Sequence, residues 1–180
     1  MIMDIYFLRH ASAGEAKLNP AQDEQRPLDK LGIEQSHNVG RALAALNVAV
    51  DAIVSSPLQR AMQTATVVAN QIRYEDKIVT DAALRSEATY EQFQDLLRRF
   101  SGKDAILVVG HDPSLTEFLN QLLLSEAAAP PVIELKKGAI AKVEKAERKP
   151  AVLKWYMTPK VVRSLQQASA NSSRPKTVSK

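Results

Sequence analysis

The feature that most constrains the fold is a run of five apolar residues, 105–109, that no polar residue interrupts. A strand with one solvent-facing side alternates apolar and polar residues, whereas a strand covered on both faces is apolar throughout. The run therefore predicts a central strand in a sheet that lies between two layers of helices. A largely apolar segment at residues 3–9 predicts the first strand of the same sheet.

Strand-like and helix-like segments alternate along the rest of the chain, which predicts a three-layer α/β/α sandwich with a mostly parallel central sheet. Ser56, Pro57 and Gln59 form a capping-box pattern, so we expect Ser56 to cap a helix. The remaining strands are predicted at residues 52–55, 78–84, 132–145 and 151–157, the last two as an antiparallel pair at the sheet edge. Helices are predicted from Asp29 to about 46, from Ser56 to about 72, over 89–100, and from about 113 to 124.

The length of the chain, 180 residues, allows one buried core and is too short for two ordinary domains. Residues 1–165 contain the predicted strands and helices, and we expect them to form this domain. Residues 166–180 are rich in Ser, Asn and Lys and have almost nothing to bury. A disordered, basic tail is predicted there.

Charge is distributed unevenly along the chain. Residues 1–135 carry 12 Lys and Arg against 18 Asp and Glu, whereas residues 136–180 carry 12 against 2. A basic end can attract nucleic acid, a membrane surface or an acidic protein. This segment lacks the interleaved aromatic residues of a base-stacking surface, so we expect a solvated end and no nucleic-acid binding.

Composition favours a cytoplasmic protein that does not enter a membrane. Hydrophobic residues make up 45% of the chain and charged residues 24%, which is the usual balance for a globular domain. No apolar stretch approaches the ~20 residues that span a bilayer, and the amino terminus begins with a strand rather than a signal segment. The chain contains no cysteine, which excludes disulfides, thiolate metal sites and a cysteine nucleophile.

Polar side chains follow three of the predicted strands at the point where each strand ends. Arg9 and His10 end the first strand, Arg60 lies just past the second, and His111 follows the strand at 105–109. The carboxyl ends of parallel strands meet at one edge of a sheet, where α/β proteins bind ligands. Two helix amino termini are predicted at the same edge and favour an anion. The set therefore predicts a phosphate site.

The same residues suit phosphoryl transfer, which needs a positioned nucleophile and cations around the phosphoryl oxygens. Arg9, Arg60 and His111 can supply those cations, and neutral His10 can attack phosphorus through one ring nitrogen. Water would then release phosphate from the phosphorylated His10. Two histidines beside two arginines, without a carboxylate cluster, disfavour a metal ion. The motifs of nucleotide cofactors and of serine hydrolases are absent, so we expect no cofactor.

Five short segments occur in a fixed order over residues 1–160. They are Leu8-Arg9-His10-Ala11; Arg26-Pro27-Leu28-Asp29 with Gly32 and Gln35; Ser55-Ser56-Pro57-Leu58-Gln59-Arg60-Ala61 with Gln63-Thr64; Gly110-His111-Asp112-Pro113; and Trp155-Tyr156-Met157-Thr158-Pro159. Together they resemble the histidine phosphatase superfamily, which has a phosphoglycerate mutase-like fold, and within it the SixA-type phosphohistidine phosphatases.

This resemblance implies roles for individual residues. His10 would be the phosphorylated nucleophile, Arg9 and Arg60 would bind phosphate, and His111 would complete the pocket. Arg26 is implied as a further phosphate-binding or entrance residue. Many members of the superfamily have Gly where this chain has Ala11, a change that is tolerated if the backbone φ there is negative.

The substrate class depends on two further features. Larger members of the superfamily roof their site with an insertion where residues 70–77 leave room only for a turn, so we expect an open, shallow pocket. Glu87 lies in the region of the proton donor of esterase and mutase relatives, but its surrounding motif differs, and a surface carboxylate is expected. An imidazole leaving from phosphohistidine needs such an acid less than an alkoxide does.

Three functions remain open on this basis. The favoured one is a phosphatase that hydrolyses phosphohistidine on a phosphoprotein, such as a histidine phosphotransfer domain in signalling. The second is a small-molecule phosphomonoesterase with Glu87 as proton donor. The third is a non-catalytic module that recognises phosphate and holds an acidic partner through its basic carboxyl-terminal end.

Overall fold

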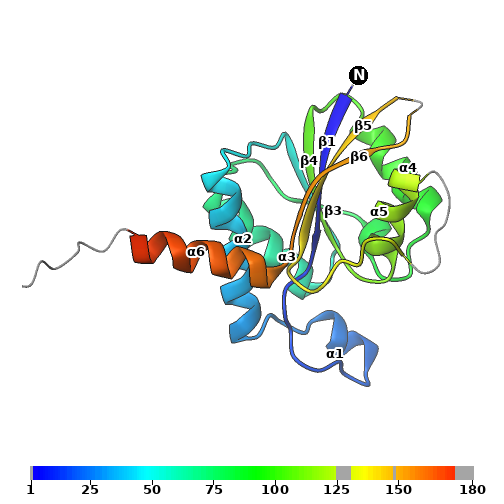
Figure 1. Ribbon diagram of the computed structural model, residues 1–180. Helices are drawn as coiled ribbons and strands as arrows, with labels where there is room; N and C mark the ends of the chain where they lie inside the picture. Colours follow the sequence, from blue (N-terminus) through cyan, green and yellow to red (C-terminus); the bar gives the residue numbers. More distant parts are fainter. Residues whose placement is uncertain (1, 125–130, 148, 173–180) are drawn as a thin grey trace, which may run out of the picture.

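The computed structural model describes residues 2–124, 131–147 and 149–172, which form a six-stranded sheet between two layers of helices (Figure 1). The strands are β1 (Ile2–Arg9), β2 (Ala52–Ser55), β3 (Val79–Thr80), β4 (Ala105–Gly110), β5 (Ile140–Ala146) and β6 (Val152–Met157). The helices are α1 (Pro20–Glu24), α2 (Lys30–Ala45), α3 (Gln59–Gln71), α4 (Tyr90–Arg99), α5 (Ser114–Leu124) and α6 (Pro159–Ser172), with a 3-10 turn at Ala82–Leu84.

The sheet has the order β3-β2-β4-β1-β5-β6. Strands β3, β2, β4 and β1 run parallel, while β5 is antiparallel to β1 and β6 is antiparallel to β5. The continuous apolar run is the central strand β4, paired with β2 on one side and β1 on the other. The predicted sandwich with a mostly parallel sheet and an antiparallel edge is therefore confirmed.

Both faces of the sheet are buried, because successive side chains of a strand point to opposite faces. Ile5 and Phe7 of β1 pack with Phe93 of α4 and Phe118 of α5. On the other face, Leu8 packs among residues of α2 and α3. Figure 1 shows α4 and α5 on one side of the sheet and α2, α3 and α6 on the other. This two-sided burial explains why the central strands are apolar without interruption.

Three local predictions were wrong. The strand predicted at 132–145 has no strand structure before Ile140, and β5 covers only Ile140–Ala146. The predicted strand at 78–84 is a two-residue strand followed by a 3-10 turn, which the Asp81 side chain caps by accepting from the Ala83 N–H. Helix α3 begins at Gln59 with Leu58 as its N-cap and no side-chain capping bond, so the Ser56 capping box does not form. The Ser56 hydroxyl is hydrogen bonded to the His111 ring instead.

The predicted disordered tail begins too early at residue 166, because α6 continues to Ser172. Its buried Val162 packs inward, and the Gln166 side chain donates a hydrogen bond to the Asn38 carbonyl of α2 at 2.6 Å. These contacts compensate for a segment with few apolar residues of its own. Residues 173–180 of the predicted tail lie outside the described residues.

Gly32 lies where α2 packs against the loop that follows β1. A Cβ at this position would be 1.9 Å from the Ser12 carbonyl oxygen, and backbone cannot move as a flexible side chain can. We expect Gly32→Ala to lower the free energy of unfolding by about 3 kcal/mol, the upper end for overpacking. Gly102→Ala is the matched control, since its Cβ would meet nothing within 4 Å. Equal urea midpoints for the two variants would contradict this prediction.

Candidate active site

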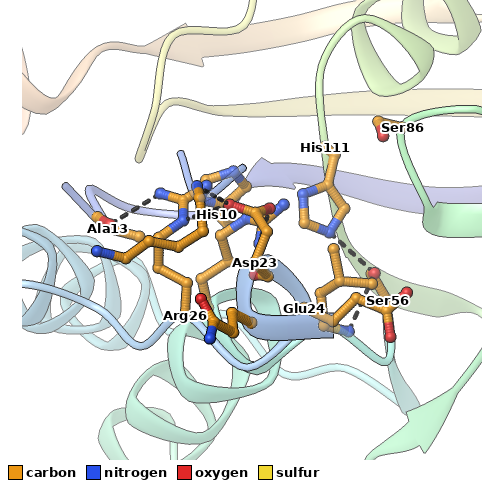
Figure 2. Close-up of polar contacts among 12 residues, drawn as sticks. His10, Ala13, Asp23, Glu24, Arg26, Ser56, Ser86 and His111 are labelled. Carbon is orange, nitrogen blue, oxygen red and sulfur yellow. Dashed lines mark hydrogen bonds and ion pairs between the residues drawn. The ribbon is translucent and has the colours of Figure 1, made fainter. Parts of the chain in front are cut away.

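The predicted site residues come together at the carboxyl end of the parallel strands. In the sheet register, Arg9 at the end of β1 is the partner of Gly110 at the end of β4, and Ser55 of β2 is the partner of Val109. The next residues along, His10 and His111, therefore leave neighbouring strands at the same edge. Their ring centroids are 4.8 Å apart, and Figure 2 shows the two rings close together.

His10 is held in one tautomer. Its Nδ1 lies 2.7 Å from the Ala11 carbonyl oxygen, which can only accept a hydrogen bond, so Nδ1 carries the proton and Nε2 carries the lone pair. The side chain is buried, and its pKa is lowered to about 3, mainly by desolvation and also by the charges of Arg60, Arg9 and Lys137, while the hydrogen bond to Ala11 opposes this shift. His10 is therefore neutral at ordinary pH and keeps a nucleophilic nitrogen.

His111 is also buried and neutral. Desolvation lowers its pKa to about 2, assisted by His10 and by nearby arginines. Its Nε2 lies 2.9 Å from the Ser56 hydroxyl, which itself accepts a hydrogen bond from the Leu58 N–H. The Ser56 hydroxyl can therefore donate its proton to Nε2, which leaves the His111 Nδ1–H free to donate to an oxyanion.

Two arginines flank the histidines and have unused donors. Arg60, on the first turn of α3, contacts Asp23 through Nη1, and Arg9 donates from Nη1 to the Leu135 carbonyl and pairs with Asp112 at 3.5 Å. Within the described residues, the Nε atoms of both arginines are buried and have no hydrogen-bond partner. A buried donor without a partner is costly, and an anion bound between the arginines would satisfy both.

Helix α1 lies beyond the carboxyl end of β1 (Figure 1), and Figure 2 draws its Asp23 and Glu24 together with the two histidines of the site. Its Asp23 carboxylate accepts a hydrogen bond from Arg26 Nε at 2.8 Å and pairs with Arg60 Nη1 at 3.2 Å. The Arg26 Nη1 also donates to the Ala13 carbonyl at 2.8 Å. Arg26 is therefore joined to Arg60 through Asp23.

The Glu87 carboxylate is hydrogen bonded to two neighbouring side chains. Its carboxylate accepts hydrogen bonds from Arg85 Nε at 2.7 Å and from the Ser86 hydroxyl at 2.9 Å, and Arg85 also pairs with Glu24 of α1. The Arg85 contact lowers the pKa of Glu87, so the carboxyl group is ionised at neutral pH. The Glu87 side chain is 66% exposed, as expected for a surface carboxylate.

The backbone at Ala11 and the connection between α3 and β3 both agree with the sequence. Ala11 is buried, and among the described non-glycine residues only Asn47 and Arg73 have positive φ, so the backbone at Ala11 accommodates a side chain. Residues 72–78 form the expected short connection between α3 and β3. Openness of the pocket stays a prediction, and α1 rather than residues 70–77 is the segment that meets the site.

Among the described residues, no group of three or more His, Asp or Glu side chains could hold a metal ion. In the same part of the chain, no helix is both long enough and apolar enough to cross a membrane.

Comparison with known proteins agrees with this geometry. Residues 5–96 match the sequence pattern of the histidine phosphatase superfamily (branch 1). The chain belongs to this superfamily. An uncharacterized protein of Picosynechococcus is 31% identical over 141 residues, covering 77% of this chain and 82% of its own length. The phosphohistidine phosphatase SixA of Escherichia coli is 26% identical over 163 residues, covering 87% and 94%. This histidine phosphatase superfamily member is a phosphatase.

Solved structures share the fold. A SixA protein histidine phosphatase complexed with tungstate has a TM-score of 0.76 at 24% identity, covering 88% of this chain and 98% of that chain. A putative alpha-ribazole-5'-P phosphatase from Escherichia coli has a TM-score of 0.71 at 18% identity, covering 87% and 97%. The fold is therefore common to phosphatases whose names indicate different substrates.

Sequence reasoning missed several residues that surround the site of this histidine phosphatase superfamily member. Asp23 and Arg85 pair with arginine and carboxylate partners at the site, and Ser56 and Thr64 are buried beneath it, where Thr64 Oγ1 accepts from the Ala11 N–H. Ser56 and Thr64 belong to a segment that carries the family resemblance, although their contacts with His111 and Ala11 were not predicted. Asp23 had a visible signal in its position three residues before Arg26, whereas the contacts of Arg85 depend on chain segments that meet only in the folded protein.

The lowered pKa values of His10 and His111 predict acid sensitivity. Both lie below the ordinary value of 6.5, so below that pH the unfolded chain binds protons that the folded chain does not. Stability that is complete above pH 6.5 is therefore lost as pH falls, by up to ~1.4 kcal/mol per pH unit for each histidine. We expect the urea midpoint to fall between pH 6.5 and 4, and less steeply in His10→Asn.

His37→Asn is the control for this measurement, because His37 faces Gln71 between α2 and α3 rather than the site. An unchanged slope in His10→Asn, or a flatter one in His37→Asn, would contradict the assignment of the acid sensitivity to the site.

Proposed function

We propose that this phosphatase hydrolyses phosphohistidine on a phosphoprotein through a covalent intermediate at His10. The observation that carries the proposal is the state of His10: neutral, buried, and with its Nε2 lone pair fixed by the Nδ1–H bond to Ala11. The unused Nε donors of Arg9 and Arg60 supply the charge stabilisation that phosphoryl transfer requires. These side chains supply nucleophile and cations without a metal ion.

The reaction takes place in two steps. In the first, the His10 Nε2 lone pair forms a bond to phosphorus, the bond from phosphorus to the substrate imidazole breaks, and the departing nitrogen takes a proton from solvent. In the second, a water oxygen bonds to phosphorus, the bond to His10 breaks, and the water proton returns to solvent. Arg9, Arg60 and the His111 Nδ1–H stabilise the equatorial oxygens in both steps.

The choice of phosphohistidine over a phosphate ester rests on the carboxylates near the site. An alkoxide leaving group needs a protonated acid, whereas Glu87 and Asp23 both have lowered pKa values and are ionised at neutral pH. An imidazole leaving group does not depend on such a donor. The name of the SixA relative, a phosphohistidine phosphatase, points to the same substrate class.

The partner we propose is a folded protein that presents phosphohistidine, such as a histidine phosphotransfer domain. Tungstate, a tetrahedral oxyanion like phosphate, is bound in a solved SixA of the same fold. To such a tetrahedral oxyanion, the described residues of the present chain offer a neutral nucleophile, His10, and two arginines.

The test measures phosphate release from a phosphorylated histidine phosphotransfer domain, with p-nitrophenyl phosphate and sugar phosphates assayed in parallel. We expect a kcat/KM for the phosphohistidine protein at least 100-fold above that for any ester. A preference for the esters would overturn the substrate assignment.

A small-molecule phosphomonoesterase is the second candidate, favoured by the fold shared with the putative alpha-ribazole-5'-P phosphatase. It requires Glu87 to donate a proton, so Glu87→Gln would slow ester hydrolysis strongly. Under the proposed function, Glu87→Gln leaves phosphohistidine hydrolysis unchanged within about twofold. Its control is Glu91→Gln, which removes a carboxylate from the first turn of α4.

A further inference from the structure

The Asp23 carboxylate joins two arginines that reach the site from different parts of the chain. Its Oδ1 accepts from Arg26 Nε at 2.8 Å, and its Oδ2 lies 3.2 Å from Arg60 Nη1. The same Arg60 nitrogen donates to the Asp23 carbonyl oxygen at 2.8 Å. One residue thus holds Arg60 through both its side chain and its backbone.

The two guanidinium groups are close enough to repel each other. Burial lowers the pKa of Arg60, the charge of Arg26 lowers it further, and Asp23 opposes both effects. The side chains of Arg60 and Arg26 are only 9% and 10% exposed, so solvent screens the repulsion weakly. A carboxylate between them is therefore needed to keep both arginines directed at one place.

Helix α1 does not depend on the Asp23 side chain for its own start. The Asn19 side chain caps α1 by accepting from the Ala21 and Gln22 N–H groups. Within α1 and the loop before it, the Asp23 carboxylate accepts a hydrogen bond from the Lys17 N–H. Its two other partners are the arginines, which points to a role in the site.

Arg26 extends this arrangement to the nucleophile. Its Nη1 donates to the Ala13 carbonyl at 2.8 Å and to the Gly14 carbonyl at 3.1 Å, in the loop that follows His10. The chain of contacts therefore runs from α3 through Arg60, Asp23 and Arg26 to this loop. Figure 2 marks the hydrogen bond between Arg26 and Ala13 with a dashed line.

We propose that Asp23 is a positioning residue that orients Arg60 toward the phosphoryl group and couples Arg26 to it. Asp23 does not touch the reacting atoms. Its loss would leave Arg60 held only through the backbone carbonyl of residue 23, without the carboxylate that offsets the charge of Arg26, so the transition state would face a less firmly oriented cation. This inference rests on the proposed function, in which Arg60 binds the transferred phosphoryl group.

The test compares Asp23→Asn with wild type for kcat and KM on the phosphohistidine protein and for the Kd of inorganic phosphate. We expect kcat/KM to fall about 30-fold, mostly in kcat, and phosphate to bind about tenfold more weakly. The matched control is Glu24→Gln on the same helix, whose carboxylate pairs with Arg85 instead, and it should stay within about twofold.

A double-mutant cycle separates positioning from a merely structural role. In the Arg60→Ala background, Asp23→Asn should have almost no further effect on kcat/KM, because the side chain it orients is gone. Additive losses, or equal losses in Glu24→Gln, would overturn the proposal. Tighter phosphate binding by Asp23→Asn would also overturn it, because Asp23 would then compete with phosphate for Arg60. Absence of His10-dependent turnover in wild type would instead refute the proposed function.

Discussion

Replacing His10 by alanine is expected to reduce turnover by about 10,000-fold or more, as when the nucleophile of a hydrolase is removed. The reason is specific to this nitrogen. The bond from Nδ1 to the Ala11 carbonyl fixes the lone pair on Nε2, and burial keeps the ring neutral, so no second group among the described site residues combines these properties.

The measurement is phosphate release from the phosphohistidine protein, combined with detection of an acid-labile phosphoenzyme in rapidly quenched reactions. Wild type should form the phosphoenzyme, and His10→Ala should not. His37→Ala is the matched control, because His37 belongs to α2 and contacts Gln71 of α3. Residual activity of His10→Ala within tenfold of wild type would refute His10 as the nucleophile.

Replacing Arg60 by alanine is expected to lower kcat/KM by about 100- to 1,000-fold, the usual effect of losing one donor that stabilises transition-state charge. Arg60 is buried beside His10, and its Nε has no partner among the described residues, so it can donate to a phosphoryl oxygen. Arg60→Lys keeps the charge but not the planar donor array, and it should recover only part of the activity.

Steady-state kinetics on the phosphohistidine protein measure this effect, with thermal unfolding to confirm that the variants are folded. Arg98→Ala serves as the control, because Arg98 is exposed at the end of α4 and pairs with Asp95. If Arg60→Ala retained kcat/KM within threefold of wild type while remaining folded, Arg60 would not bind the transferred group.

Local patterns predicted much of the fold correctly. The helix over Lys30–Ala45 has the predicted Asp29 cap, and the strands β1, β2 and β4 lie within two residues of their predicted bounds. Two of the errors occur where a side chain is used by a distant partner. Ser56 has the sequence of a helix cap but binds His111, 55 residues away. Residues 166–172 look like a tail but form part of a helix that packs on α2.

Residue order alone indicates which side chains could form a phosphate site, because strand ends in a parallel sheet bring Arg9, His10 and His111 to one edge. It also determined the two-sided burial of the sheet, since the apolar run at 105–109 allows no solvent-facing side. These properties follow from local periodicity and from the direction of parallel strands.

The chemical state and orientation of those residues depend instead on how the folded chain packs around them. The pKa values of His10 and His111 depend on burial by the whole fold, and the His10 tautomer depends on the rotation of its ring toward the Ala11 carbonyl. The link from Arg60 to Asp23 joins residues 37 positions apart. Burial and contacts between distant segments are properties of packing, which residue order does not reveal.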